Sequence, residues 1–223
     1  MAANAAALRG ITKQYKNFTL GPVDMTVPAG SIVGLIGENG AGKTTLLKIL
    51  CGVNRADDGT VDLLVGSPAD AATRAKIGVV FEDAFFYGSF TAAQVARSLA
   101  GMYGAQWNAD SFSAYLRRFG LDAGKKLKEY SRGMRLKLSL AAALAHDPEL
   151  LVLDEACAAC KNDLVEEALL REAAARAEQG AEVVLTGREP AAWMQDAADY
   201  STELRAVRHP YTRGIAAREG VEY

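Results

Sequence analysis

Short apolar runs alternate with amphipathic segments along most of the chain. Four runs have the length of β-strands, and they lie at 32–36, 77–81, 150–153 and 182–186. The first three are apolar throughout, which is typical of strands buried in a parallel sheet. Helical patterns separate these runs, at about 44–50, 69–76, 91–103, 108–119, 135–145 and 163–179. The alternation predicts an α/β domain with a mainly parallel sheet.

The pattern differs near the N-terminus and in the middle of the chain. Residues 8–30 alternate loosely and contain turn signals at Gly21-Pro22 and 28–30, so we expect antiparallel strands joined by turns. The helical patterns between 91 and 130 interrupt the strand–helix alternation and predict an inserted helical lobe. We therefore expect a single domain over 1–223, with a helical subdomain at about 83–133 and a C-terminal tail at 201–223.

Local signals also place several element ends. A turn at 57–59 leads into a strand predicted at 60–65. Asn108 and Gly120 mark the start and end of one helix. Asp163 and Glu166 have capping-box spacing, which predicts that the next helix begins there and ends at Gly180.

Residues 37–44 match the phosphate-binding pattern G-x-x-x-x-G-K-[ST] between a predicted strand and a predicted helix. Glycines in such a loop let backbone N–H groups converge on phosphate oxygens, and the helix N-terminus adds partial positive charge. Lys43 is expected to reach the β- and γ-phosphates, and the Thr44 hydroxyl to ligate Mg²⁺. The loop predicts that the chain binds a nucleoside triphosphate.

An acidic pair follows the apolar run at 150–153. Asp154 is placed to hold Mg²⁺ opposite Thr44, directly or through water. Glu155 is placed to orient or deprotonate an attacking water. The alternative is a strand that merely ends in two solvated acids, but the complete phosphate loop favours the nucleotide role.

Composition and charge limit the classes of partner and the cellular compartment that we expect for this chain. The chain has 223 residues, of which 50% are hydrophobic and 23% are charged, as in an ordinary soluble protein. A net charge of −2 argues against a nucleic-acid partner, which requires a basic face. There is no signal-peptide pattern and no apolar run of 18 residues, so a membrane role would come through a partner. Three cysteines fit a reducing cytoplasm.

Together with these motifs, the stretch Ser131-Arg132-Gly133-Met134 points to a family. It looks like a variant of the L-S-G-G-Q signature, and the chain resembles the ATP-binding cassette (ABC) ATPases over nearly its whole length. The resemblance implies a P-loop (RecA-like) fold with an N-terminal antiparallel subdomain. It also implies ATP and Mg²⁺ as cofactors, and phosphate binding by Gly37, Asn39, Gly40, Ala41, Gly42, Lys43, Thr44 and Thr45.

The resemblance implies further roles at a shared site. Tyr15 would stack on adenine, with a half-buried strand tyrosine as the alternative. Ser131 and Gly133 would close over the nucleotide of an opposing subunit, so that two cassettes form a homodimer or heterodimer. Lys43 and Glu155 would be catalytic, and Glu82 would stand where the family usually has a glutamine that meets Mg²⁺ and the attacking water.

The function implied is the ATP-binding subunit of an ABC transporter, and residues 78–83 resemble the bacitracin-export branch of small exporters. Motion would pass to separate membrane subunits through the surface at 82–90 and the helical lobe, at the inner face of the cell membrane. Two alternatives stay open. One is a weakly hydrolysing regulatory cassette that completes a partner's site. The other is a soluble cassette in translation or DNA repair, which usually has a second cassette or a coiled coil.

Four positions depart from the family pattern. Glu82 replaces the glutamine. Counting back from 198–200 places the switch-histidine position at Glu189, with Arg188 as the nearest alternative, and neither is a histidine. Lys161 replaces an aspartate that supports the dimer interface and the active-site geometry. Cys157 and Cys160 form a C-x-x-C before a helix, for which we favour incidental small residues in a relaxed loop over a redox role. The two histidines, His146 and His209, are expected at the surface and not as displaced switches.

Overall fold

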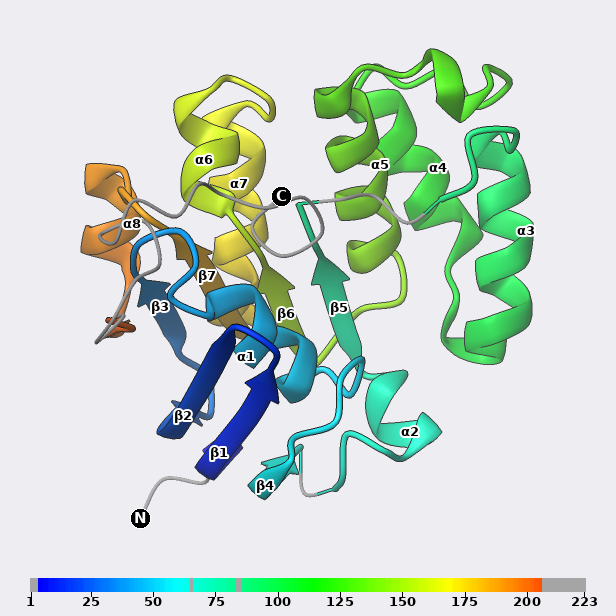
Figure 1. The fold of residues 1–223 in the computed structure, drawn as a ribbon. Helices are drawn as coiled ribbons and strands as arrows, with labels where there is room; N and C mark the ends of the chain where they lie inside the picture. Colours follow the sequence, from blue (N-terminus) through cyan, green and yellow to red (C-terminus); the bar gives the residue numbers. More distant parts are fainter. Residues whose placement is uncertain (1–3, 65, 83–85, 206–223) are drawn as a thin grey trace.

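The computed structural model describes residues 4–64, 66–82 and 86–205, which form two β-sheets with helices around them (Figure 1). The smaller sheet is antiparallel and has the order β2-β1-β4, from β1 (Asn4–Tyr15), β2 (Phe18–Pro28) and β4 (Asp58–Leu63). The larger sheet is parallel and has the order β5-β6-β7-β3-β8. Its strands are β3 (Ile32–Ile36), β5 (Ile77–Val80), β6 (Leu150–Leu153), β7 (Glu182–Gly187) and β8 (Tyr200–Glu203).

Eight α-helices connect these strands in the described residues. They are α1 (Lys43–Leu50), α2 (Ala71–Arg74), α3 (Ala92–Tyr103), α4 (Ala109–Arg118), α5 (Arg132–Leu144), α6 (Ala156–Lys161), α7 (Glu167–Ala174) and α8 (Ala192–Ala197). Short 3₁₀ turns lie at Gly104–Gln106, Leu127–Glu129 and Ala175–Gln179. In Figure 1, α3, α4 and α5 stand together beside β5 at one edge of the parallel sheet. None of the helices in the described residues is long and apolar enough to cross a bilayer.

The parallel sheet is covered on both faces, which explains why its strands β3, β5 and β6 are apolar throughout. Leu150 and Val152 of β6 pack into a cluster with α1 and the antiparallel sheet. Leu151 and Leu153 point to the opposite face and pack with α5 and α7. Successive strand residues face opposite sides, so a strand buried on both faces must be apolar at every position. The predicted fold class is confirmed, while the division at 83–133 stays a prediction.

The N-terminal prediction is right about antiparallel pairing and wrong about one turn. β1 and β2 pair antiparallel, and their connection lies at Lys16 and Asn17. Gly21-Pro22 does not form the turn, because it lies inside β2. A proline lacks an N–H donor and is tolerated on an edge strand, and β2 is the edge of its sheet. The strand predicted at 60–65 starts earlier, at Asp58, and ends at Leu63.

The segment after the acidic pair also differs from the prediction. Residues expected to form a relaxed loop form helix α6, and α7 begins at Glu167 instead of Asp163. Asp163 has a left-handed backbone (φ 51°), which interrupts the helical pattern between α6 and α7. The Glu166 side chain contacts Lys137 of α5 instead of closing a capping box. Sequence inspection also missed α8, and most of the predicted tail, 206–223, lies outside the described residues.

Candidate nucleotide-binding site

The phosphate-loop residues lie between the end of β3 and the start of α1. Gly42 has φ 101°, and a Cβ there would stand 2.8 Å from Leu20 Cδ1 and 2.9 Å from Phe18 Cζ. The backbone conformation therefore favours glycine here, and a side chain would also displace the tips of Leu20 and Phe18. The Gly37 N–H donates to Gly187 O at the end of β7 (3.2 Å). Asn39 and Gly40 are exposed, Ala41 is buried, and Thr45 is half-buried in the first turn of α1.

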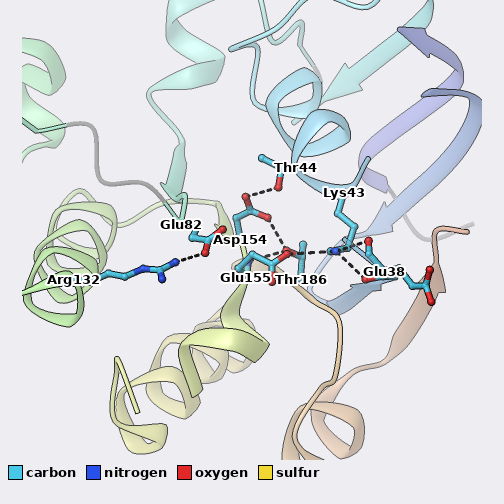
Figure 2. Close-up of polar contacts among 9 residues, drawn as sticks. Glu38, Lys43, Thr44, Glu82, Arg132, Asp154, Glu155 and Thr186 are labelled. Atoms are coloured by element: carbon cyan, nitrogen blue, oxygen red, sulfur yellow. Dashed lines mark hydrogen bonds and ion pairs between the residues drawn. The ribbon is translucent and has the colours of Figure 1, made fainter. Parts of the chain in front are cut away.

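Lys43 is buried at the base of this loop, with 4% of its residue surface exposed. Its Nζ donates to Gly37 O (2.8 Å) and Glu38 O (3.2 Å), and lies 3.4 Å from Glu155 Oε1 (Figure 2). Buried cations are stable only when oxygen acceptors surround them. These oxygens hold the Lys43 ammonium against the phosphate loop, in a position suited to binding a phosphate.

Asp154 connects α1 to β7 through two threonine hydroxyls. Thr44 Oγ1 donates to Asp154 Oδ2 (2.9 Å), and Thr186 Oγ1 donates to Asp154 Oδ1 (2.8 Å) (Figure 2). Thr186 also accepts from the Glu155 N–H (3.0 Å). Glu155 has φ 53°, a left-handed conformation that few non-glycine residues adopt. Lys43, Thr44, Asp154 and Thr186 are hereafter called the floor of the site.

Burial raises the pKa of the Asp154 carboxyl above its usual value, and the charge of Glu82 adds to this. The hydrogen bonds from Thr186 and Thr44 and the charge of Lys43 act in the opposite direction. The result is a carboxylate whose charge is incompletely compensated. Mg²⁺ prefers oxygen ligands and usually completes its shell with water and substrate phosphates. A carboxylate and a hydroxyl in contact therefore fit this ion chemically.

Thr186 is the floor residue that the sequence analysis missed. It was expected only as the last residue of a strand, yet it is fully buried. The strand order explains its place, because β7 lies between β6 and β3 and its carboxyl end therefore lies beside both Asp154 and the phosphate loop. A polar residue ending an apolar run is the same signal that identified Asp154. Identifying Thr186 as part of the site also requires the order of the strands in the sheet, which the sequence analysis did not predict.

Glu82 lies at the edge of this cluster and faces the helical segment. Its carboxylate forms an ion pair with Arg132 at the start of α5 (Figure 2). Both side chains are about half exposed, at 46% and 55%. The structure gives Glu82 a cationic partner from the signature-like stretch, and its influence on Asp154 is through charge.

A second ion pair joins two of the departures from the family pattern. Lys161 Nζ at the end of α6 contacts Glu189 Oε2, and Arg188 Nη2 lies 3.7 Å from Glu189 Oε1. Lys161 and Arg188 lower the pKa of the Glu189 carboxyl, Lys161 having the larger effect. The pairs Glu82–Arg132 and Lys161–Glu189 are hereafter called the rim of the site.

Tyr15 lies at the end of β1 and is 40% exposed. Its ring stacks on Phe18, with centroids 6.3 Å apart, and its hydroxyl accepts from Asn54 Nδ2 (3.2 Å). Phe18 in turn faces Gly42 of the phosphate loop. An exposed aromatic face beside the loop is compatible with adenine stacking, which stays a prediction.

Ser131 and Gly133 belong to a different part of the structure. Ser131 Oγ accepts from the Met134 N–H at the start of α5 (3.2 Å), so it caps that helix. A Cβ on Gly133 would collide with the Leu164 carbonyl, which explains the glycine there. In the described part of the chain, the contacts of these two residues are not with the phosphate loop. A role toward an opposing subunit is a prediction that this chain alone does not test.

The C-x-x-C and the histidines have structural surroundings. Cys157 packs against Gly187, and burial raises the pKa of its thiol to about 11, so the thiolate needed for redox chemistry is disfavoured. His146 is buried, contrary to the surface prediction, because its ring stacks on Tyr103 with centroids 4.1 Å apart. Its two nitrogens contact the carbonyls of Ala142 and Ile77. His209 lies outside the described residues.

Family models match the chain in two places. The ABC transporter model matches residues 20–158, which include the phosphate loop, the signature-like stretch and the acidic pair. A model of ATP:corrinoid adenosyltransferases matches residues 105–223, a range that begins after the phosphate loop. The family is therefore assigned from the first match, which contains the nucleotide motifs.

Curated relatives and solved structures agree with the first match. The chain is 38% identical over 152 residues to an ABC transporter ATP-binding protein of Synechocystis, covering 66% of this chain and 43% of the relative. It is 37% identical over 150 residues to the bacitracin transport ATP-binding protein BcrA of Enterococcus faecalis, covering 65% and 48%. The chain thus spans about half the length of these curated relatives.

The fold is similar to solved ATP-binding cassettes. An ATP-binding subunit of an ABC transporter superposes with a TM-score of 0.77 at 22% identity, covering 96% of this chain and 95% of that one. The dimeric cassette MJ0796 bound to ADP and Pi superposes with a TM-score of 0.75 at 21% identity, covering 91% and 97%. At these identities the similarity concerns the fold.

Proposed function

The chain belongs to the ABC transporter family of ATP-binding cassettes, and on this premise we propose that it binds and hydrolyses ATP as the ATP-binding subunit of a transporter. The observation that carries the proposal is the floor of the site. Lys43 and Thr44 begin α1, and Thr44 contacts Asp154, which lies 110 residues further along the chain and also accepts from Thr186. That arrangement supports a phosphate-binding cation next to an oxygen pair suited to a metal.

Each side chain then has a defined task. Lys43 and the loop N–H groups bind phosphate oxygens, and Thr44 and Asp154 hold Mg²⁺, which supplies charge neutralisation at the phosphates. Glu155 orients and deprotonates the attacking water, and Glu82 assists it at the edge of the site. Tyr15 stacks on adenine. The remaining phosphate-binding residues are Gly37, Asn39, Gly40, Ala41, Gly42 and Thr45.

The partners follow from the family and from the relatives. A relative is named for bacitracin transport, and on this likeness and that of residues 78–83 we propose an exporter. We propose that the chain pairs with a second cassette, to whose nucleotide it presents Ser131 and Gly133. Separate membrane subunits would contact the surface at 82–90, which includes the exposed Tyr87 (75%) beside Phe90. This places the chain on the inner face of the membrane. Residues 83–85 lie outside the described structure.

The test is single-turnover ATP hydrolysis by the purified chain, compared with Glu155→Gln. Loss of a general base should lower the rate by about 10²–10⁴-fold while ATP binding is kept. Glu149→Gln is the matched control, because Glu149 pairs with Lys76 before β6 and should leave the rate unchanged. If wild type and Glu155→Gln bind ATP and are equally inactive, the hydrolytic proposal is wrong and the regulatory alternative replaces it. If ATP does not bind, both fail.

A further inference from the structure

Two of the departures from the family pattern, Lys161 and Glu189, contact each other. They lie 28 residues apart, Lys161 at the end of α6 and Glu189 after β7. Each residue is unusual for the family when considered alone. Lys161 is a cation in place of an aspartate, and Glu189 is an acid in place of a histidine. Together they form an ion pair of opposite charges. The contact suggests that one residue compensates for the other.

The segment that carries Glu189 is anchored to the nucleotide site. Thr186 Oγ1 donates to Asp154, and Gly187 O accepts from the Gly37 N–H at the start of the phosphate loop. Glu189 follows two residues later, a stretch of backbone that spans at most about 7 Å. Because the Gly187 carbonyl contacts the start of the phosphate loop, a free carboxylate at Glu189 would add negative charge near the phosphates of a bound nucleotide.

The segment after Glu155 is held against the same place. Cys157 packs so closely on Gly187 that a Cβ on that glycine would collide with it. The left-handed Glu155 is bonded to Thr186 and starts α6, so the helix has a set direction and ends with Lys161 beside Glu189. Arg188 is a second cation near the Glu189 carboxylate, at 3.7 Å. These contacts fix the two segments that carry Lys161 and Glu189, and so hold the two side chains beside each other.

We propose that Lys161 is a positioning residue that neutralises Glu189, so that the site accepts the γ-phosphate of ATP despite an acid at the switch position. This inference rests on the proposed ATP-binding function. The pair is exposed, at 64% and 55%, and exposed ion pairs add little to stability. Its effect is therefore on the choice of nucleotide and not on folding.

The experiment measures the affinity of the full chain for AMP-PNP, a non-hydrolysable ATP analogue, and for ADP, both with Mg²⁺. Lys161→Gln leaves Glu189 uncompensated apart from Arg188, and should weaken AMP-PNP binding about fivefold. ADP lacks the γ-phosphate, so its affinity should change less than about twofold. Lys161→Arg keeps the charge and should behave like the wild type. A merely structural role would change both affinities alike.

The second mutation completes the cycle. Lys161→Gln/Glu189→Gln removes both charges and should restore AMP-PNP binding to the level of Glu189→Gln alone. Lys76→Gln is the control, since Lys76 forms a comparably exposed pair with Glu149 at the amino ends of β5 and β6. It changes the net charge equally and should leave both affinities unchanged.

Two results would overturn the inference while leaving the proposed function intact. Equal weakening of AMP-PNP and ADP by Lys161→Gln would indicate a structural effect. A double variant that stays as weak as Lys161→Gln would indicate that Lys161 acts on the nucleotide directly. If the wild type binds neither nucleotide, the proposed function itself is wrong, and the inference falls with it.

Discussion

The floor and the rim belong to one site but differ in burial and in their agreement with the family pattern. Lys43, Asp154 and Thr186 are at most 4% exposed, and a chain of hydrogen bonds joins Thr44, Asp154, Thr186 and Glu155. The rim pairs are 46–64% exposed. Glu82, Lys161 and Glu189 replace residues common in the family, and Arg132 lies in the altered signature. Buried polar groups without partners are costly, whereas exposed charges are solvated. Two oppositely charged rim residues can therefore be substituted together at little cost in stability. A single substitution in the floor leaves a buried partner without its hydrogen bond and lowers stability.

The largest effect is expected from Lys43→Met. It removes the buried cation at the phosphate loop and should weaken ATP binding by about 100-fold or more, because charge-assisted bonds to phosphate are lost. Calorimetric titration with ATP measures this. The control is Lys48→Met in the same helix, whose ammonium lies over the Phe81 ring, 5.8 Å from its centroid. If both variants bind ATP equally, the floor is not the phosphate site.

Thr186→Val should destabilise the protein by about 1–3 kcal/mol. The change keeps the shape but removes the donor to Asp154 and the acceptor of the Glu155 N–H, both within a buried cluster. Denaturant unfolding gives the free energy. Thr186→Ser keeps the hydroxyl and should lose less. Equal losses in the two variants would mean that packing of the methyl group, and not the hydrogen bonds, matters at this position.

A substitution at His146 tests whether burial of a titratable group outside the site lowers the stability of the protein when that group is charged. Burial lowers the pKa of its imidazole below 6.5, although the carbonyls of Ala142 and Ile77 oppose this. The unfolded chain therefore takes up the proton first, and the stability from this residue is present above pH 6.5 and is lost as the pH falls below it. Between pH 7.5 and 5.5 the wild type should lose about 1 kcal/mol more than His146→Phe. Parallel pH profiles of the two proteins would contradict this.

The smallest effect is expected at the rim, from Glu82→Gln. Breaking the exposed pair with Arg132 should change the free energy of unfolding by about 0.5 kcal/mol. Because the charge of Glu82 raises the pKa of Asp154, the variant should also lower that pKa. Chemical denaturation and NMR titration measure the two effects, with Arg132→Gln as the control for the broken pair. A destabilisation as large as that of Thr186→Val would remove the distinction between floor and rim.

Several features of this protein follow from short stretches of sequence. The phosphate loop and the apolar strands depend on local spacing, and they lie where the patterns predicted. Local signals failed where a distant contact competed. Glu166 contacts Lys137 instead of closing a capping box, Gly21-Pro22 lies within the edge strand β2 instead of turning, and His146 is buried against Tyr103.

By itself, the sequence determined the fold class and the family, because apolar periodicity and the phosphate loop are encoded over a few consecutive residues. Only the tertiary structure decided the strand order, which inserts β7 between β6 and β3 and brings Thr186 between Asp154 and the loop. Only the tertiary structure paired Lys161 with Glu189. Such contacts depend on the packing of segments far apart in the chain, and no local pattern encodes which segments become neighbours.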